Sequence, residues 1–280
     1  MSRRTGAGAP PRSISVVVKI VLTVLYVIPL VWIILEALKS APEALSAPDA
    51  VLFSPTLATL RSVIGEAGAS VLLSLKVTVA ASGAVILFGL PASYALARRT
   101  TPWWSRVVSV ILILLLFLQM VPQPMTVIPL YGMLAQWHLL GSLTGLIIAD
   151  TALVLPFSVL LLRPFVLAIP ETLYESAALD GAGGFQIFLR IVVPLMRNGL
   201  ATVASIVFIL VWGEFIYASN FITEGSTYPV SALLAQQIGT YSTGWNTLMA
   251  LALLTSIPLL VIFVFAQRRL TAGLTIGAIK

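Results

Sequence analysis

The chain has 280 residues, of which 59% are hydrophobic and only 9% are charged, and its formal net charge is +6. So few polar side chains cannot cover a water-soluble globule, which indicates a protein whose main solvent is lipid. The absence of cysteine excludes disulfide frameworks and thiolate chemistry, and the single histidine, His138, argues against a histidine-built metal site. The positive charge does not indicate nucleic acid, because no basic cluster interleaved with aromatic residues is present.

The chain begins with a stretch rich in Arg, Gly and Pro, residues 1–13, whose composition predicts a disordered tail. The apolar run that follows, 14–38, is longer than the hydrophobic core of a signal peptide, and no A-x-A-like cleavage site opening a soluble domain comes after it. We therefore interpret this run as an uncleaved first membrane span.

Six apolar runs are long enough to cross the hydrocarbon layer, which takes about 20 helical residues. The sequence thus predicts an all-α membrane protein with a membrane domain at 14–267 and a C-terminal tail at 268–280. Prolines interrupt most of the runs, and simple kinks explain them as well as a mechanistic role does. The six runs are 16–38, 70–96, 107–127, 142–165, 199–222 and 247–266.

Lys and Arg residues are distributed unequally between the two sides of these spans. Thirteen of the sixteen fall on one side, and only Lys39, Arg61 and Lys76 fall on the other. Because cytoplasmic loops carry the excess of positive charge, both termini are predicted to be cytoplasmic.

One loop, 169–200, between the fourth and fifth runs, is too polar for lipid and is predicted to be helical. Pro170 suits a first helical turn, and Glu171 and Glu175 place negative charge near the positive end of the helix dipole. The glycines that begin at Gly181 end this helix, and a second short helix is expected from Phe185 to Val193, before Pro194.

The first helix of this loop offers a surface of small residues, Ser176, Ala177 and Ala178, framed by Glu175 and Asp180. Small side chains allow the close approach of another protein. The alternative is an amphipathic helix lying on the membrane surface, but such a helix favours Lys or Arg on its polar face, whereas this one carries glutamates. We therefore interpret the loop as a docking element.

The spacing of this loop resembles the cytoplasmic "EAA" signature of permease subunits in binding-protein-dependent ABC importers. Ser176 and Val193 depart from that pattern by small changes in volume. The matching positions are Glu175, Ala177, Gly181, Ile191 and Pro194.

Other segments are similar to carbohydrate-importing permeases of the maltose type, especially the second, six-span partner. They are the segment from Ser74 to Arg98 with its Tyr94-Ala-Leu-Ala-Arg98 ending, the approach to the loop from Pro156 to Ile169, the Trp212-Gly-Glu-Phe215 sequence and the ending that starts at Gln267. The resemblance implies a type I ABC importer permease fold, with the loop helix as the coupling helix. It implies that the ATPase subunit is contacted by Glu175, Ser176, Ala177, Ala178, Asp180, Gly181 and Phe185.

The resemblance also implies a complex in the cell membrane. Its partners would be a second homologous permease subunit, two ATPase subunits that bind ATP and Mg, and an extracytoplasmic sugar-binding protein. This chain would bind no cofactor and catalyse no reaction, and its Gly181-Ala-Gly-Gly run lacks the Lys-Ser/Thr of a phosphate-binding loop. Arg outnumbers Lys twelve to four, which is typical of a GC-rich genome such as an actinobacterium's. Together with the resemblance, such a source suggests trehalose or a maltose-like disaccharide as the cargo.

Two carboxylates, Asp150 and Glu214, lie within predicted spans, where a charge costs about 2.5–3.5 kcal/mol or more at the bilayer centre. Each must therefore face protein or water. Aromatic rings beside a carboxylate and an amide suit sugar binding, and the alternative is a structural hydrogen bond between helices. The candidate substrate-path residues are Glu214, Trp212, Tyr217, Asn220, Asp150 and Gln119.

Two other classes of function compete with transport. An intramembrane transferase would use Asp150 and Glu214 as an acid and base, which requires the two to share a site. An ion channel would need rings of charge or a carbonyl filter, and neither is visible in the sequence.

Overall fold

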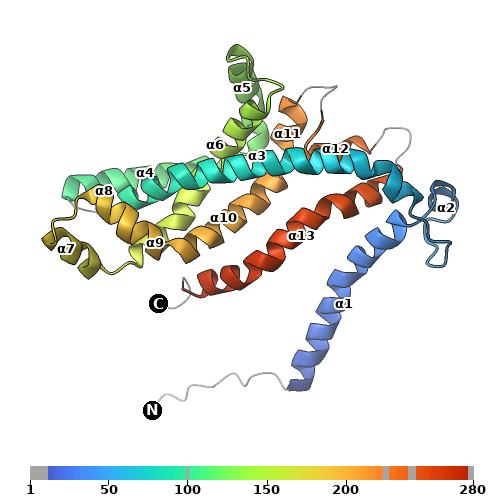
Figure 1. Ribbon diagram of the computed structural model, residues 1–280, viewed down its shortest axis with the longest axis horizontal. Coiled ribbons are helices and arrows are strands. Elements are labelled where there is room, and N and C mark those ends of the chain that lie inside the picture. The colour runs from blue at the N-terminus through green and yellow to red at the C-terminus, as the bar shows by residue number, and fades with distance from the viewer. Residues whose placement is uncertain (1–11, 99–100, 223–226, 239–243, 277–280) are drawn as a thin grey trace. The chain divides into compact units, whose positions relative to one another are not determined.

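The computed structural model describes residues 12–98, 101–222, 227–238 and 244–276, with the backbone alone at 12–15 and 265–276. Helices form almost all of this described part, which contains no β-sheet (Figure 1). The chain divides into two compact units, one made of 1–65 with 237–254 and the other of 66–236 with 255–280.

The first unit contains α1 (Arg12–Ala37) and α2 (Ala41–Ser46), with the beginnings of α3 (Ala58–Ala97) and α13 (Trp245–Ile276). The buried side chain of Lys39 fastens the turn after α1. Its Nζ donates hydrogen bonds to the Glu36 carboxylate and to the Pro48 carbonyl, both at 2.5 Å. These contacts satisfy an ammonium group that is only 1% exposed.

The second unit is built around α6 (Leu143–Leu167), which packs against α4 (Pro102–Met120) and α10 (Arg197–Trp212). Leu146, Val154 and Leu162 of α6 lie in the main hydrophobic core. Glycine allows α10 to approach α6 closely, because a Cβ at Gly199 would lie only 2.7 Å from Cγ of Phe165. This unit also contains α5 (Gln123–Gln136), α11 (Ile216–Phe221) and α12 (Val230–Gln236).

The approximate positions of most predicted spans are confirmed. Five helices are long and apolar enough to cross a membrane, and a sixth span is possible if two helices bent by 72°, 184–195 and 197–212, count as one. The predicted tail at 1–13 lies mostly outside the described residues, and α1 already begins at Arg12. At the other end, α13 continues to Ile276, and 277–280 lie outside the described residues.

Two of the spans differ from the predicted continuous helices. The third ends at Met120, and α5 begins at Gln123, because Pro122 and Pro124 lack the N–H groups that would continue the helix. The fifth is interrupted between Trp212 and Ile216, where Gly213 follows α10. Both interruptions lie inside apolar runs, so hydropathy alone does not reveal them.

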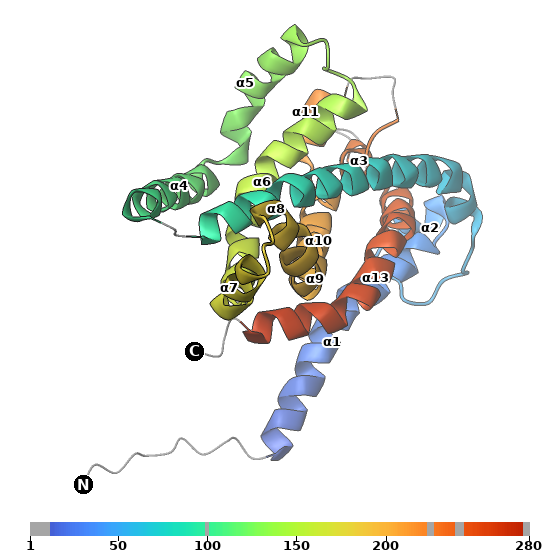
Figure 2. The same ribbon diagram turned by 60° about the vertical axis from the view of Figure 1, so that its left-hand side comes forward.

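The helical loop between the fourth and fifth spans is confirmed as α7 (Glu171–Leu179), followed by α8 (Gly184–Ile187), a π-helix (Phe188–Val192) and α9 (Val193–Leu195). The second helix therefore does not end before Pro194. In the π-helix the Val193 N–H donates to the Phe188 carbonyl, five residues earlier, and this wider turn accommodates the following proline. Within the second unit, α7 to α9 lie at the end opposite α5 and α11 (Figures 1 and 2).

Candidate functional site

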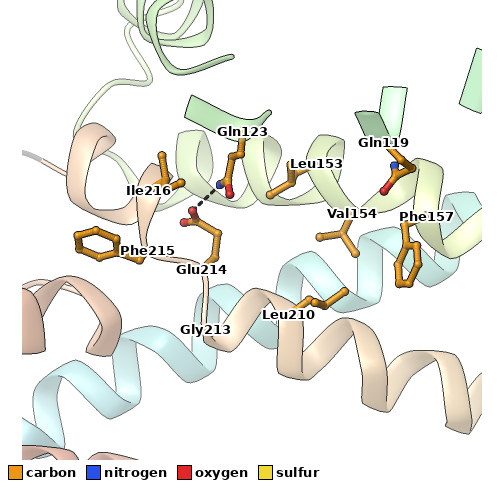
Figure 3. Close-up of a pocket in the computed structure, with 10 residues that line it drawn as sticks. All are labelled: Gln119, Gln123, Leu153, Val154, Phe157, Leu210, Gly213, Glu214, Phe215 and Ile216. Carbon is orange, nitrogen blue, oxygen red and sulfur yellow. Dashed lines mark hydrogen bonds between the residues drawn. The ribbon is translucent and has the colours of Figure 1, made fainter. Parts of the chain in front are cut away.

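A cavity of about 560 Å³ lies where the two interrupted spans meet α6 (Figure 3). Its polar groups are Gln119 at the end of α4, Gln123 at the start of α5 and Glu214 in the break after α10. Phe157 and Phe215 belong to its otherwise apolar lining, but the Phe215 ring points away from the other lining side chains (Figure 3). A mostly apolar cavity with a few placed polar groups has the composition of a small-molecule site. The remaining lining residues are Leu153, Val154, Leu210, Gly213 and Ile216.

Glu214 is held by hydrogen bonds from its own chain. Its Oε1 accepts from the Gln123 Nε2 at 2.6 Å (Figure 3). The same Oε1 accepts from the Tyr217 N–H at 2.7 Å, and Oε2 accepts from the Ala218 N–H at 2.9 Å. The two N–H groups belong to the first turn of α11, which has no intrahelical partners for them. Glu214 therefore caps α11 and joins it to α5.

Asp150 lies behind this arrangement, in a second and much smaller cavity that Glu214, Ser74, Thr78 and Ser231 also line. The Asp150 side chain is 2% exposed, and its Oδ1 has no hydrogen-bond partner in the described part of the chain. This cavity, of about 10 Å³, holds at most one water molecule. Asp150 and Glu214 thus do meet, but in a space too small for the substrate of an intramembrane transferase.

The other predicted substrate-path residues do not line the larger cavity. Trp212 stacks on Phe208, with ring centroids 5.7 Å apart, in a separate apolar cluster. The buried Tyr217 shares a 2.5 Å hydrogen bond between its hydroxyl and that of Thr126, and Asn220 is exposed and donates to the Ile216 carbonyl at 2.6 Å.

Sequence reasoning missed Gln123 and Phe157 as lining residues of the larger cavity. Each adjoins a proline in an apolar run, Gln123 lying between Pro122 and Pro124 and Phe157 following Pro156. An amide or aromatic residue beside a proline in an apolar run is therefore the sequence pattern that could have identified these cavity-lining residues.

The loop helix α7 offers a second candidate surface. Glu175, Ser176, Ala178 and Asp180 are exposed, as expected for docking, but Ala177 is 8% exposed and packs into the core. Consecutive helical residues are about 100° apart, so three in a row cannot share one face. The Ser176 hydroxyl donates to its own helix, to the Thr172 carbonyl at 2.8 Å.

The turn after α7 extends this surface. Gly181 has a φ of +79°, a left-handed conformation that glycine adopts without strain and that ends the helix. Phe185, a predicted docking residue, is 75% exposed, and Leu179, which sequence reasoning missed, is 89% exposed. Both side chains are therefore accessible to a partner protein.

The buried side of α7 is anchored by Tyr174, which is 4% exposed. Burial raises the pKa of the Tyr174 phenol above its ordinary value, so the ring stays neutral at physiological pH. Among the described residues, no group of three His, Asp or Glu side chains is arranged to hold a metal ion.

Comparison with known proteins agrees with this geometry. A probable ABC transporter permease, y4oR of Sinorhizobium fredii, is 31% identical over 262 residues, which cover 93% of this chain and 92% of the relative. The diacetylchitobiose uptake permease DasC of Streptomyces coelicolor is 35% identical over 210 residues, 74% of each chain. A bacterial ABC transporter structure involved in alginate import superposes with a TM-score of 0.77 at 18% identity, covering 94% of this chain and 99% of that chain.

The structural likeness confirms the type I permease fold that the sequence predicted. The model of a protein family, the binding-protein-dependent transport system inner membrane component, matches residues 86–276, which include α4, the larger cavity and the whole α7 loop. The chain belongs to this family of ABC transporter permeases.

Proposed function

We propose that this chain is the membrane subunit of an ATP-driven carbohydrate importer, in which it forms half of the translocation path. The observation that carries the proposal is the pairing, in one compact unit, of an amide-bearing cavity on interrupted spans with an exposed helical loop at the opposite end. Interrupted helices beside a cavity are typical of transporters, because only there can irregular backbone persist at membrane depth.

Carbohydrate is the cargo class that the cavity and the relatives support together. Gln119 and Gln123 offer amide groups for sugar hydroxyls, and Phe157 offers a ring face for sugar C–H groups. DasC is named for diacetylchitobiose, and another relative, from Bacillus subtilis, for melibiose, raffinose and stachyose. Within this class we favour a disaccharide such as trehalose or maltose, with this chain as the second, six-span permease.

The proposed complex contains a second permease chain, two ATPase subunits and an extracytoplasmic sugar-binding protein. ATP and Mg bind to the ATPase subunits, and this chain itself catalyses no reaction. The excess of Lys and Arg on one side supports a cytoplasmic position for α7 and both termini. Glu175, Ala178, Asp180 and Phe185 then face the ATPase from α7 and its turn.

Transport follows from movement of this loop. Closure of the ATPase subunits on ATP displaces α7, and the helices that carry the larger cavity swing between inward-open and outward-open states. The sugar enters from the binding protein while the cavity faces outward, and leaves when it faces the cytoplasm.

Two substitutions in the loop test the proposal. Glu175→Lys reverses an exposed charge on α7, and Gly181→Asp forces a side chain into a left-handed turn. Both variants are expected to insert and assemble but to separate ATP hydrolysis from sugar uptake. Glu66→Lys, an equal charge change at an exposed position of α3, serves as the control. Normal sugar uptake by both loop variants in reconstituted vesicles would contradict the proposal.

A further inference from the structure

The C-terminal end of α3 contacts α7 through a cation–π interaction between Arg98, which directly follows α3, and Tyr174 of α7. The Arg98 guanidinium lies over the Tyr174 ring, 4.5 Å from its centroid, and the Arg98 Nη2 lies 3.7 Å from the Glu171 Oε1. Tyr174 is almost fully buried, whereas Glu171 is exposed. A cation over a buried ring is held more strongly than an exposed ion pair, so Tyr174 is the main contact.

A second aromatic contact extends this interaction beyond the glycine turn. The Tyr94 ring, one turn before Arg98, lies 6.4 Å from the Tyr174 ring and 5.3 Å from the Phe188 ring. Tyr174 belongs to α7, and Phe188 begins the π-helix that follows α8. The end of α3 therefore contacts both helical parts of the loop.

The C-terminal end of α3 is also tied to two other helices. Trp104 of α4 donates its indole N–H to the Arg98 carbonyl at 2.7 Å, and Arg163 of α6 donates its Nε–H to the Leu96 carbonyl at 3.1 Å. Carbonyls in the last turn of a helix have no intrahelical partner, so these bonds fix the end of α3 in place.

The helices joined here also reach the larger cavity. On α4, Trp104 lies near the start of the helix, and Gln119, near its end, lines the cavity. On α6, Arg163 lies about two turns after Phe157, which also lines the cavity. If α7 moves and the end of α3 moves with it, the displacement therefore reaches α4 and α6, two helices that line the cavity. Such a contiguous set of contacts can carry coupling between sites when it includes an element that has two positions.

We propose that Arg98 and Tyr174 are positioning residues that clasp α7 to the end of α3, so that the two move as one body when the ATPase acts. The clasp passes displacement of α7 to α4 and α6, and through them to the cavity. This inference rests on the proposed function of the chain as an importer subunit. A merely structural contact would instead hold the loop in place without affecting the link between ATP hydrolysis and transport.

Substitutions at the clasp separate these two roles in the complete complex, reconstituted with its binding protein. Tyr174→Leu and Arg98→Ala are expected to lower binding-protein-stimulated ATP hydrolysis and sugar uptake by about tenfold, the scale of typical coupling between sites, while assembly is retained. Tyr174→Phe is expected to keep both activities, because the Tyr174 hydroxyl has no hydrogen-bond partner among the described residues. Arg106→Ala, at an exposed arginine of α4, is the matched control.

A covalent replacement of the clasp gives a second test that does not depend on how Tyr174→Leu folds. The chain contains no cysteine, so Arg98→Cys with Glu171→Cys creates its only thiols, at side chains that meet in the structure. Coupling is expected to be lost in this double variant and regained when a short bis-maleimide joins the two thiols. Inhibition by the cross-link would show that α3 and α7 must slide past each other, which would overturn the clasp.

The wild-type complex distinguishes failure of the clasp from failure of the proposed function. If wild-type protein imports sugar with ATP and assembled Tyr174→Leu does so equally well, the clasp alone is wrong. If the wild-type complex shows no ATP-dependent sugar uptake, the proposed function is wrong and the clasp falls with it.

Discussion

Gly199→Ala tests how closely α10 packs on α6. In the structure a Cβ at this position would lie 2.7 Å from Cγ, 2.8 Å from Cδ1 and 3.1 Å from Cβ of Phe165. These atoms include the base of the Phe165 side chain, so a rotation of the ring alone does not relieve the contact. Overpacking of this kind costs about 1–3 kcal/mol, which corresponds to a fall in melting temperature of roughly 2–12 °C for a domain of this size.

Thermal melting of the detergent-solubilised complex measures this effect. Phe165→Ala combined with Gly199→Ala is expected to recover part of the lost stability relative to Phe165→Ala alone, because the added methyl group then fills space that the ring vacates. Gly83→Ala is the matched control, since a Cβ there meets nothing within 4 Å. The reasoning would be refuted if Gly199→Ala melted at or above the wild-type temperature, because α6 and α10 would then be more loosely packed than the structure shows.

Four further substitutions test other parts of the chain. Glu214→Gln should destabilise the complex by about 1–3 kcal/mol, because its amide turns a donor toward the N–H groups of α11, and the melting temperature measures this. Gln119→Leu should weaken sugar affinity in a binding assay without lowering the melting temperature. Asp150→Asn should leave sugar uptake in vesicles unchanged, because its cavity admits no sugar. The hydrogen bond from the Ser40 hydroxyl lowers the pKa of Glu43 below its ordinary value of 4.5. The Glu43 carboxylate therefore stabilises the start of α2 fully above pH 4.5, and this stabilisation is lost as the pH falls through the lowered pKa. Glu43→Gln should remove this pH dependence, which hydrogen exchange of the α2 amides measures.

Hydropathy and spacing predicted the spans and the helical loop because both are local properties of the chain. Runs of apolar residues mark α1, α3 and α6, and Gly181 marks the end of α7 with the conformation that the sequence led us to expect. The break before Gln123 was not predicted, since a proline inside an apolar run can either kink a helix or end it. Which of the two occurs depends on whether neighbouring groups satisfy the freed backbone, and hydropathy does not contain that information.

The candidate site was predicted less completely, because its contacts join distant segments. Glu214 was identified as a carboxylate inside a span, but its partner Gln123 lies 91 positions earlier in the chain. Trp212 is close to Glu214 in sequence and nevertheless points into another apolar cluster, with Phe208 and Val230. Ala177 was assigned to the docking face because it lies between Ser176 and Ala178 in the sequence. Helical periodicity instead places it on the buried face, three residues after Tyr174.

The polar residues of the two interrupted spans have different roles in the cavity. An interrupted helix in hydrocarbon exposes N–H groups that need acceptors, and Glu214 supplies them for Tyr217 and Ala218. Its third bond, to the Gln123 Nε2, occupies one end of that amide and leaves the Gln123 Oε1 for a ligand. Gln119 makes no hydrogen bond to another residue of the described chain, so its whole amide is available to a sugar. Affinity and sugar preference should therefore respond to changes at Gln119, whereas changes at Glu214 should first affect the stability of the interrupted span.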